Sequence, residues 1–171
     1  MKKQNKIFLI GPMGSGKTTI GKAIAASLGL KFVDSDHEIQ ERTGADISTI
    51  FEYEGEKGFR EREAQAIEEL TKIEHQVLST GGGAILRSDN RKYLSGRGLV
   101  IYLNCTPEQQ FERTYKDKKR PLIQTEDPLG FLKDLMKIRD PLYKEIADHI
   151  ISTEGRSANA VSKDIIDLVS L

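Results

Sequence analysis

Gly11-Pro12-Met13-Gly14-Ser15-Gly16-Lys17-Thr18 is the stretch that decides the fold of this chain. It follows the pattern G-x-x-x-x-G-K-[ST], in which glycines let the backbone curl so that successive N–H groups point at phosphate oxygens. The lysine supplies charge for the β- and γ-phosphates, and the threonine hydroxyl can ligate Mg²⁺. The residues expected to bind the nucleotide here are Gly14, Ser15, Gly16, Lys17, Thr18 and Thr19.

The segments on either side of this loop support that interpretation. Residues 7–10 form a short apolar run typical of a buried strand, and residues 17–28 carry apolar side chains at helical spacing. Further apolar runs predict strands at 31–34, 76–80, 99–103 and 149–152. Helical patterns occupy 36–43, 47–54, 56–72, 87–94, 107–115, 128–147 and 158–168. This alternation predicts an α/β fold, in which helices cover both faces of a parallel sheet and ligands bind beyond the carboxyl ends of the strands.

Length, charge balance and cysteine content narrow the possible classes of protein further. The length of 171 residues fits one domain, 1–171, and the 26 basic residues balance the 26 acidic ones. That balance leaves no basic excess for a nucleic-acid partner. Cys105 is the single cysteine, so an internal disulfide is impossible and a reducing compartment is expected. The apolar run after Met1 is too short for a signal peptide, and no segment approaches the ~18 apolar residues that span a membrane. We therefore expect a cytoplasmic protein without a membrane partner.

Asp34-Ser35-Asp36 closes the second predicted strand. Ser35 and Glu38 match an S-x-x-E capping box, which predicts Ser35 as the N-cap of the next helix. The two flanking carboxylates, beside a nucleotide, could serve Mg²⁺ and a substrate hydroxyl respectively. Because the strand 76–80 lacks the terminal Asp of a usual Walker B motif, Asp34 is the better candidate for the metal, through water.

Three further features suit an anionic ligand. Glu63 falls within the apolar stripe of its helix and Arg60 lies at the edge, so they form either a local ion pair or a couple presented to a ligand. Gly81-Gly82-Gly83 is either a flexible turn or a place where a ligand approaches the backbone. Arg139 lies on an apolar helix stripe just before Pro141, which should kink or end that helix.

Residues 116–121 are rich in charge and lie between two predicted helices. They form either a solvated loop or a mobile basic lid that closes over the nucleotide.

In their order along the whole chain, these motifs closely resemble the shikimate kinase family. The matching segments are 11–18, 34–36, 58–60 with Glu63, 81–83, 120–122 and 139–143. The resemblance implies a three-layer, nucleoside-monophosphate-kinase-like fold whose five-stranded parallel sheet has the order 2-3-1-4-5, with a mobile lid. It also implies transfer of the ATP γ-phosphate to the 3-hydroxyl of shikimate, giving 3-phosphoshikimate and ADP in chorismate and aromatic amino-acid biosynthesis.

The resemblance assigns roles to individual residues. Asp36, Lys17 and Arg120 would be catalytic, and Thr18 and Asp34 would serve Mg²⁺. Shikimate would be held by Asp36, Arg60, Glu63, Gly81, Gly82, Gly83 and Arg139. Arg113, Arg120 and Arg156 would contact ATP, Arg113 and Arg156 near the adenine. A substrate-binding helical segment is expected at about 34–62 and the lid at about 114–126, in a monomer whose partners are shikimate and ATP.

Two alternatives remain open at this point. A gluconate or nucleoside-type kinase shares the loop and the lid, although two inward arginines favour a carboxylated acceptor. A regulatory GTPase would use Asp127-Pro128-Leu129-Gly130 as a D-x-x-G motif, but the chain has no N-K-x-D guanine motif.

Overall fold

The centre of the molecule is a parallel sheet with the strand order β2-β3-β1-β4-β5. The computed structural model describes residues 5–115 and 125–170. The strands are β1 (Lys6–Ile10), β2 (Lys31–Asp34), β3 (Gln76–Ser79), β4 (Leu99–Asn104) and β5 (His149–Ser152). The order expected from the family resemblance is confirmed.

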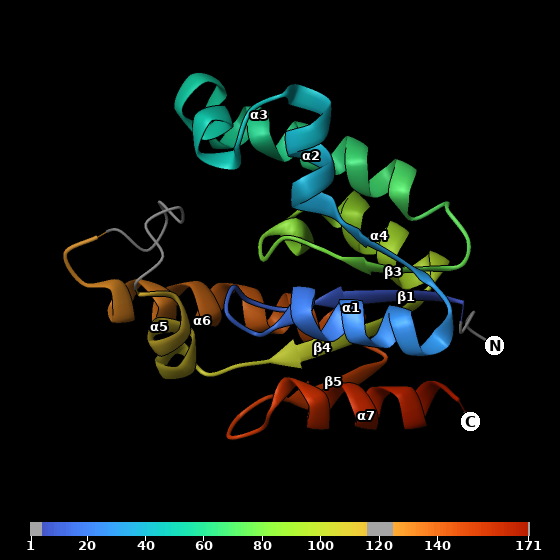
Figure 1. Ribbon diagram of the computed structural model, residues 1–171. Coiled ribbons are helices and arrows are strands. Elements are labelled where there is room, and N and C mark those ends of the chain that lie inside the picture. The colour runs from blue at the N-terminus through green and yellow to red at the C-terminus, as the bar shows by residue number, and fades with distance from the viewer. Residues whose placement is uncertain (1–4, 116–124, 171) are drawn as a thin grey trace.

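Helices pack on both faces of this sheet (Figure 1). They are α1 (Lys17–Leu28), α2 (Ser35–Thr43), α3 (Ile47–Leu70), α4 (Ser88–Arg97), α5 (Pro107–Thr114), α6 (Pro128–Ile146) and α7 (Ala158–Val169), with a 3₁₀ turn, η1 (Ala84–Leu86). Side chains of β1 alternate between two apolar cores. Ile7 and Leu9 lie in the core with α1 and α7, whereas Phe8 and Ile10 lie in the core with α3, α4 and α6. Burial on both faces explains why the central strands are continuous apolar runs.

Two helices, α3 and α6, contain a residue of a type that commonly interrupts helices. The predicted helices 47–54 and 56–72 are joined as α3, with non-helical backbone at Gly55 (φ 71°, ψ −180°). Glycine tolerates this positive φ, so the break falls where the two patterns separate. The helix does not end at Pro141, because α6 continues through it to Ile146, in line with the predicted helix over 128–147. Proline removes one backbone hydrogen bond, and packing of the buried Arg139 and Tyr143 on either side outweighs that loss.

The strand register brings the functional segments to one edge. Asp34 of β2 pairs with Ser79 of β3, and Ser79 pairs with Leu9 of β1. The segments that follow these strands therefore leave the sheet side by side, at its carboxyl edge. The described chain ends lie at the opposite side of the molecule (Figure 1). Among the described residues, no helix has the length and apolar character needed to cross a membrane.

Candidate active site

The loop between β1 and α1 has the backbone that its glycines predict. Gly14 and Gly16 have φ values of 79° and 89°, which favour glycine. A Cβ on Gly11 would lie 2.5 Å from the carbonyl oxygen of Leu103, so the loop is also tightly packed against β4. Gly16 is the N-cap of α1, which directs the first N–H groups of the helix into the loop.

Lys17 lies within this loop. Its Nζ donates hydrogen bonds to the carbonyl oxygens of Gly11 and Pro12, at 2.7 and 2.8 Å. The ammonium group is thus held at the centre of the loop, within reach of bound phosphate oxygens. Thr19 is exposed in the first turn of α1, and Ser15 is buried beside Lys17.

Thr18 and Asp34 come together as predicted for a metal site. The Thr18 hydroxyl donates to Asp34 Oδ2 at 3.3 Å. These are the hard oxygen donors that Mg²⁺ prefers, and Mg²⁺ usually takes only one or two protein ligands besides water and phosphate. That usage agrees with the described residues, in which no group of three or more His, Cys, Asp or Glu side chains is arranged to hold a metal ion. The residues present therefore fit Mg²⁺.

Asp34 also corrects one prediction. The N-cap of α2 is Asp34, whose Oδ1 accepts from the backbone N–H groups of Asp36 and His37 at 2.9 and 3.1 Å. The predicted Ser35 capping box is wrong, because the helix begins one residue earlier, at Ser35 itself. The Ser35 hydroxyl instead accepts a hydrogen bond from Gly81 N–H at 3.2 Å. It thereby ties α2 to the glycine segment.

Asp36 combines a buried carboxylate oxygen with a raised pKa. Its Oδ1 is buried and has no hydrogen-bond partner among the described residues. Burial, together with the negative charges of Glu63 and Asp34, raises the pKa of Asp36 to about 7, although Lys17 and Arg60 act in the opposite direction. A carboxyl group with a pKa near neutrality is suited to general-base chemistry.

Arg60 and Glu63 form a pair at the same site. Arg60 Nη1 donates to Glu63 Oε1 at 2.9 Å, and Glu63 is 1% exposed. The second guanidinium nitrogen, Nη2, makes a longer contact of 3.4 Å with Glu56. Burial raises the pKa of Glu63 while the nearby Arg60 and Arg139 lower it. The pair is therefore buried and ordered, unlike a solvated surface ion pair.

The glycine segment 81–83 fits closely among these side chains. A Cβ on Gly81 would lie 2.8 Å from Asp36 Oδ1, and one on Gly83 would lie 2.4 Å from Arg60 Nη2. A Cβ on Gly82 would lie 3.5 Å from Nη1 of Arg139, which is 7% exposed. The segment is therefore a packed part of the site. The inward orientation predicted for Arg139 is confirmed.

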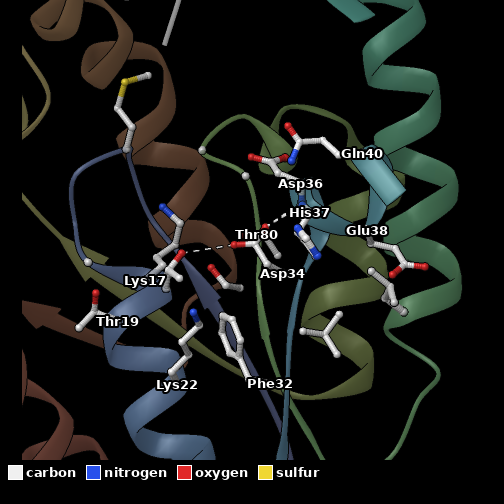
Figure 2. A pocket seen from close by; sticks show the side chains of 18 of the residues that line it. Lys17, Thr19, Lys22, Phe32, Asp34, Asp36, His37, Glu38, Gln40 and Thr80 are labelled. Carbon is white, nitrogen blue, oxygen red and sulfur yellow. Dashed lines mark hydrogen bonds between the residues drawn. The ribbon is translucent and has the colours of Figure 1, made fainter. Parts of the chain in front are cut away.

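The cleft at this edge of the sheet has a volume of about 1040 Å³. Lys17, Thr18, Asp34, Asp36, Gly81 and Gly82 are among its lining residues. Lys17 on α1 and Asp36 on α2 face it from opposite sides (Figure 2). A group transferred from a nucleotide in the loop would therefore meet the Asp36 side of the cleft.

Arg113 and Arg156 lie near each other, beside the part of the phosphate-binding loop that contains Gly14. Arg113 Nη1 donates to the Gly14 carbonyl at 2.7 Å, and its Nη2 donates to the Thr153 carbonyl at 3.4 Å. The backbone N–H of Arg156 donates to that same Thr153 carbonyl, and its guanidinium pairs with Asp164. Arg120, and most of the expected lid 114–126, lie outside the described residues.

The structure also shows the contacts of two further residues, Asp127 and Tyr143. Asp127 of the D-x-x-G match is the N-cap of α6 and accepts from Gly130 N–H at 3.1 Å, which explains the motif without a nucleotide. Tyr143 was named only within the motif 139–143, yet its hydroxyl donates to the Gly82 carbonyl. Its position four residues after the inward Arg139, on the same helix face, is the signal that could have identified it.

Known proteins similar to this chain support one family. The family model described as shikimate kinase matches residues 13–170. A shikimate kinase from Histophilus somni is 57% identical over 99% of this chain and 97% of its own length. One from Methylococcus capsulatus is 52% identical over 98% of this chain and 93% of its own length.

Solved structures agree. A shikimate kinase from Acinetobacter baumannii in complex with shikimate superposes with a TM-score of 0.94 at 52% identity, over 96% of this chain and 92% of that one. The shikimate kinase from Aquifex aeolicus superposes with a TM-score of 0.83 at 34% identity, over 96% of this chain and 95% of that one. With the loop and the paired carboxylates in one cleft and the inward arginines beside the glycine segment, these matches show that the chain belongs to the shikimate kinase family.

Proposed function

We propose that this protein transfers the γ-phosphoryl group of ATP to the 3-hydroxyl of shikimate, releasing 3-phosphoshikimate and ADP. One observation carries the proposal: Asp36, with its raised pKa, shares a cleft with the phosphate-binding loop, and the inward Arg60 and Arg139 lie beside the glycine segment that borders Asp36. Membership of the family, and the shikimate bound to the Acinetobacter baumannii relative, support shikimate as the acceptor.

The nucleotide half follows from the loop. The backbone N–H groups of residues 14–19 and the Lys17 ammonium bind the phosphates, and Arg113 and Arg156 flank the adenine. Thr18 would hold Mg²⁺ through its hydroxyl, and Asp34 would do so through water. When bound, Mg²⁺ neutralises phosphate charge and fixes the phosphate geometry.

The acceptor half follows from the buried polar groups. Arg60 and Arg139 bind the shikimate carboxylate with their planar guanidinium groups, and Glu63 keeps Arg60 in place. Gly81, Gly82 and Gly83 let the sugar-like ring approach the backbone. Asp36 then accepts the proton of the attacking hydroxyl as the oxygen–phosphorus bond forms and ADP leaves.

The remaining assignments rest on sequence and family. Segment 34–62 binds the substrate, segment 114–126 acts as the lid, and Arg120 contacts the transferred phosphoryl group. We propose a cytoplasmic monomer that acts on ATP and shikimate without nucleic acid or membrane. The balanced charge and the free, buried Cys105 support this.

The test is ADP release from MgATP with shikimate, gluconate or nucleoside monophosphates as the acceptor. We expect turnover that depends on shikimate and is far weaker with the others. Faster turnover with gluconate would favour the carboxylate-binding alternative, and faster turnover with a nucleoside monophosphate would favour a nucleotide kinase. Either result would overturn the proposal.

A further inference from the structure

Among the described residues, three hydrogen bonds to carbonyl oxygens hold the glycine segment 81–83, and one of the three donors is a side chain. The carbonyl of Gly81 accepts from Ala84 N–H, and that of Gly83 accepts from Leu86 N–H, at 3.0 and 3.1 Å. Both are local bonds of the turn that leads into η1. The Gly82 carbonyl instead accepts from the Tyr143 hydroxyl, at 2.5 Å, across 61 residues of chain.

Tyr143 is fixed in that position from several sides. It is fully buried, and its ring stacks on Tyr102 of β4 with 4.7 Å between ring centroids. Tyr102 is in turn tied to α6, because its hydroxyl donates to Asp140 Oδ1 at 2.8 Å. The phenol is therefore held rigidly against the sheet, with its hydroxyl aimed at the glycine segment.

The orientation of the Gly82 carbonyl affects the shape of the proposed substrate pocket. Its peptide unit also carries the Gly83 N–H, so fixing the oxygen fixes the direction of that donor. On either side of it lie Arg60, packed on Gly83, and Arg139, packed on Gly82. Tyr143 follows Arg139 by one helical turn, so one helix face supplies both a substrate arginine and the support for the glycine backbone.

We infer that Tyr143 is a positioning residue, which holds the Gly82 carbonyl and so preorganises the surface that receives the acceptor. The inference rests on the proposed function, in which that acceptor is shikimate. Asp36 is connected to the glycine segment by a different hydrogen bond, which Gly81 N–H donates to the Ser35 hydroxyl on α2. Loss of the Tyr143 hydroxyl should therefore weaken acceptor binding more than it slows the chemical step.

The test compares Tyr143→Phe with Tyr102→Phe. Both remove one buried hydroxyl from the same aromatic stack, but only the first releases Gly82. We expect Tyr143→Phe to raise KM for shikimate about 3- to 10-fold, the range that one neutral hydrogen bond corresponds to. Its kcat and its KM for ATP should stay within about twofold of wild type. Tyr102→Phe should leave all three constants near wild type, even if its midpoint of thermal unfolding falls as much.

Other outcomes would overturn the inference. If Tyr143→Phe is folded and its KM for shikimate is unchanged, the hydroxyl does not position the acceptor surface. If both variants change KM equally, the effect is one of general packing. If wild type itself shows no shikimate-dependent ADP release, the proposed function fails instead, and that result is distinct from either of these.

Discussion

At the residue scale, the proposed base chemistry of Asp36 and its burial act on its charge in opposite directions. General-base chemistry requires the carboxylate to be charged, whereas burial beside Glu63 and Asp34 disfavours the charged form. The compromise is a pKa of about 7, which leaves a substantial charged fraction at neutral pH. Such a group is more basic than an ordinary aspartate, and it costs folding stability when it is ionised.

Replacing Asp36 with Asn should abolish most turnover while the fold persists. General-base assistance contributes ~10²- to 10⁴-fold in rate, and Asn cannot accept the proton. The α2 helix should remain, because its cap is Asp34 rather than residue 36. Initial rates of ADP release at saturating substrates measure the effect, with circular dichroism as the control for folding. A kcat close to wild type would show that Asp36 is only a polar residue of the helix terminus.

The same substitution should change stability in a pH-dependent way. The folded-state pKa of Asp36 is raised above 3.8, so the folded state binds the extra proton between about pH 4 and 7. Its contribution to stability is therefore full below pH 4 and is lost as pH rises through 7. Without metal or nucleotide, Asp36→Asn should come close to wild type near pH 4 and exceed it by ~4 kcal/mol near pH 8. Urea unfolding at both pH values tests this, and an equal difference at the two values would contradict it.

At the element scale, the start of α2 joins two functions in one side chain. Asp34 caps the helix with Oδ1 and faces Thr18 with Oδ2. Helix geometry therefore fixes the carboxylate that the proposed metal site would use. Sequence alone could not separate Asp34 from Ser35 as the cap, because both residue types cap helices and the choice depends on where β2 ends.

Asp34→Asn should separate the two functions. Asn caps helices about as well as Asp, so the midpoint of thermal unfolding should change little. The Mg²⁺ concentration for half-maximal activity should rise about 10-fold or more, since a charged partner of the metal is lost. Asp46→Asn is the matched control, because Asp46 caps α3 by bonding Thr49 N–H. An unchanged Mg²⁺ requirement in Asp34→Asn would remove Asp34 from the metal site.

The glycine segment makes a second prediction at this scale. Gly83→Ala places a Cβ against the Arg60 guanidinium, which can move aside because it ends a flexible side chain. Stability should fall, because the displaced guanidinium weakens its bond to the buried Glu63, and KM for shikimate should rise about 10-fold. Gly96→Ala is the control: its Cβ meets nothing within 4 Å, so only helix propensity changes, by up to ~1 kcal/mol of stabilisation. Unchanged shikimate kinetics in Gly83→Ala would contradict the placement of Arg60 in the acceptor site.

At the scale of the whole molecule, periodicity predicted the sheet, its helices and the edge where the site lies. The phosphate loop, Asp34, Asp36 and the inward Arg60, Glu63 and Arg139 were all identifiable, because each is an unusual residue for its local pattern. What sequence could not supply depends on contacts between distant segments. The bond from Tyr143 to Gly82, for example, spans 61 residues.

We propose that the cleft transfers a phosphoryl group from ATP to the 3-hydroxyl of a carboxylated acceptor. The most direct measurement is ³¹P and ¹H NMR of the product formed from MgATP and shikimate. We predict a phosphomonoester whose phosphorus couples to the proton on carbon 3, formed in equal amount to ADP and not detected with Asp36→Asn. Phosphate on another hydroxyl, or ADP formed together with inorganic phosphate while shikimate is unchanged, would contradict the account.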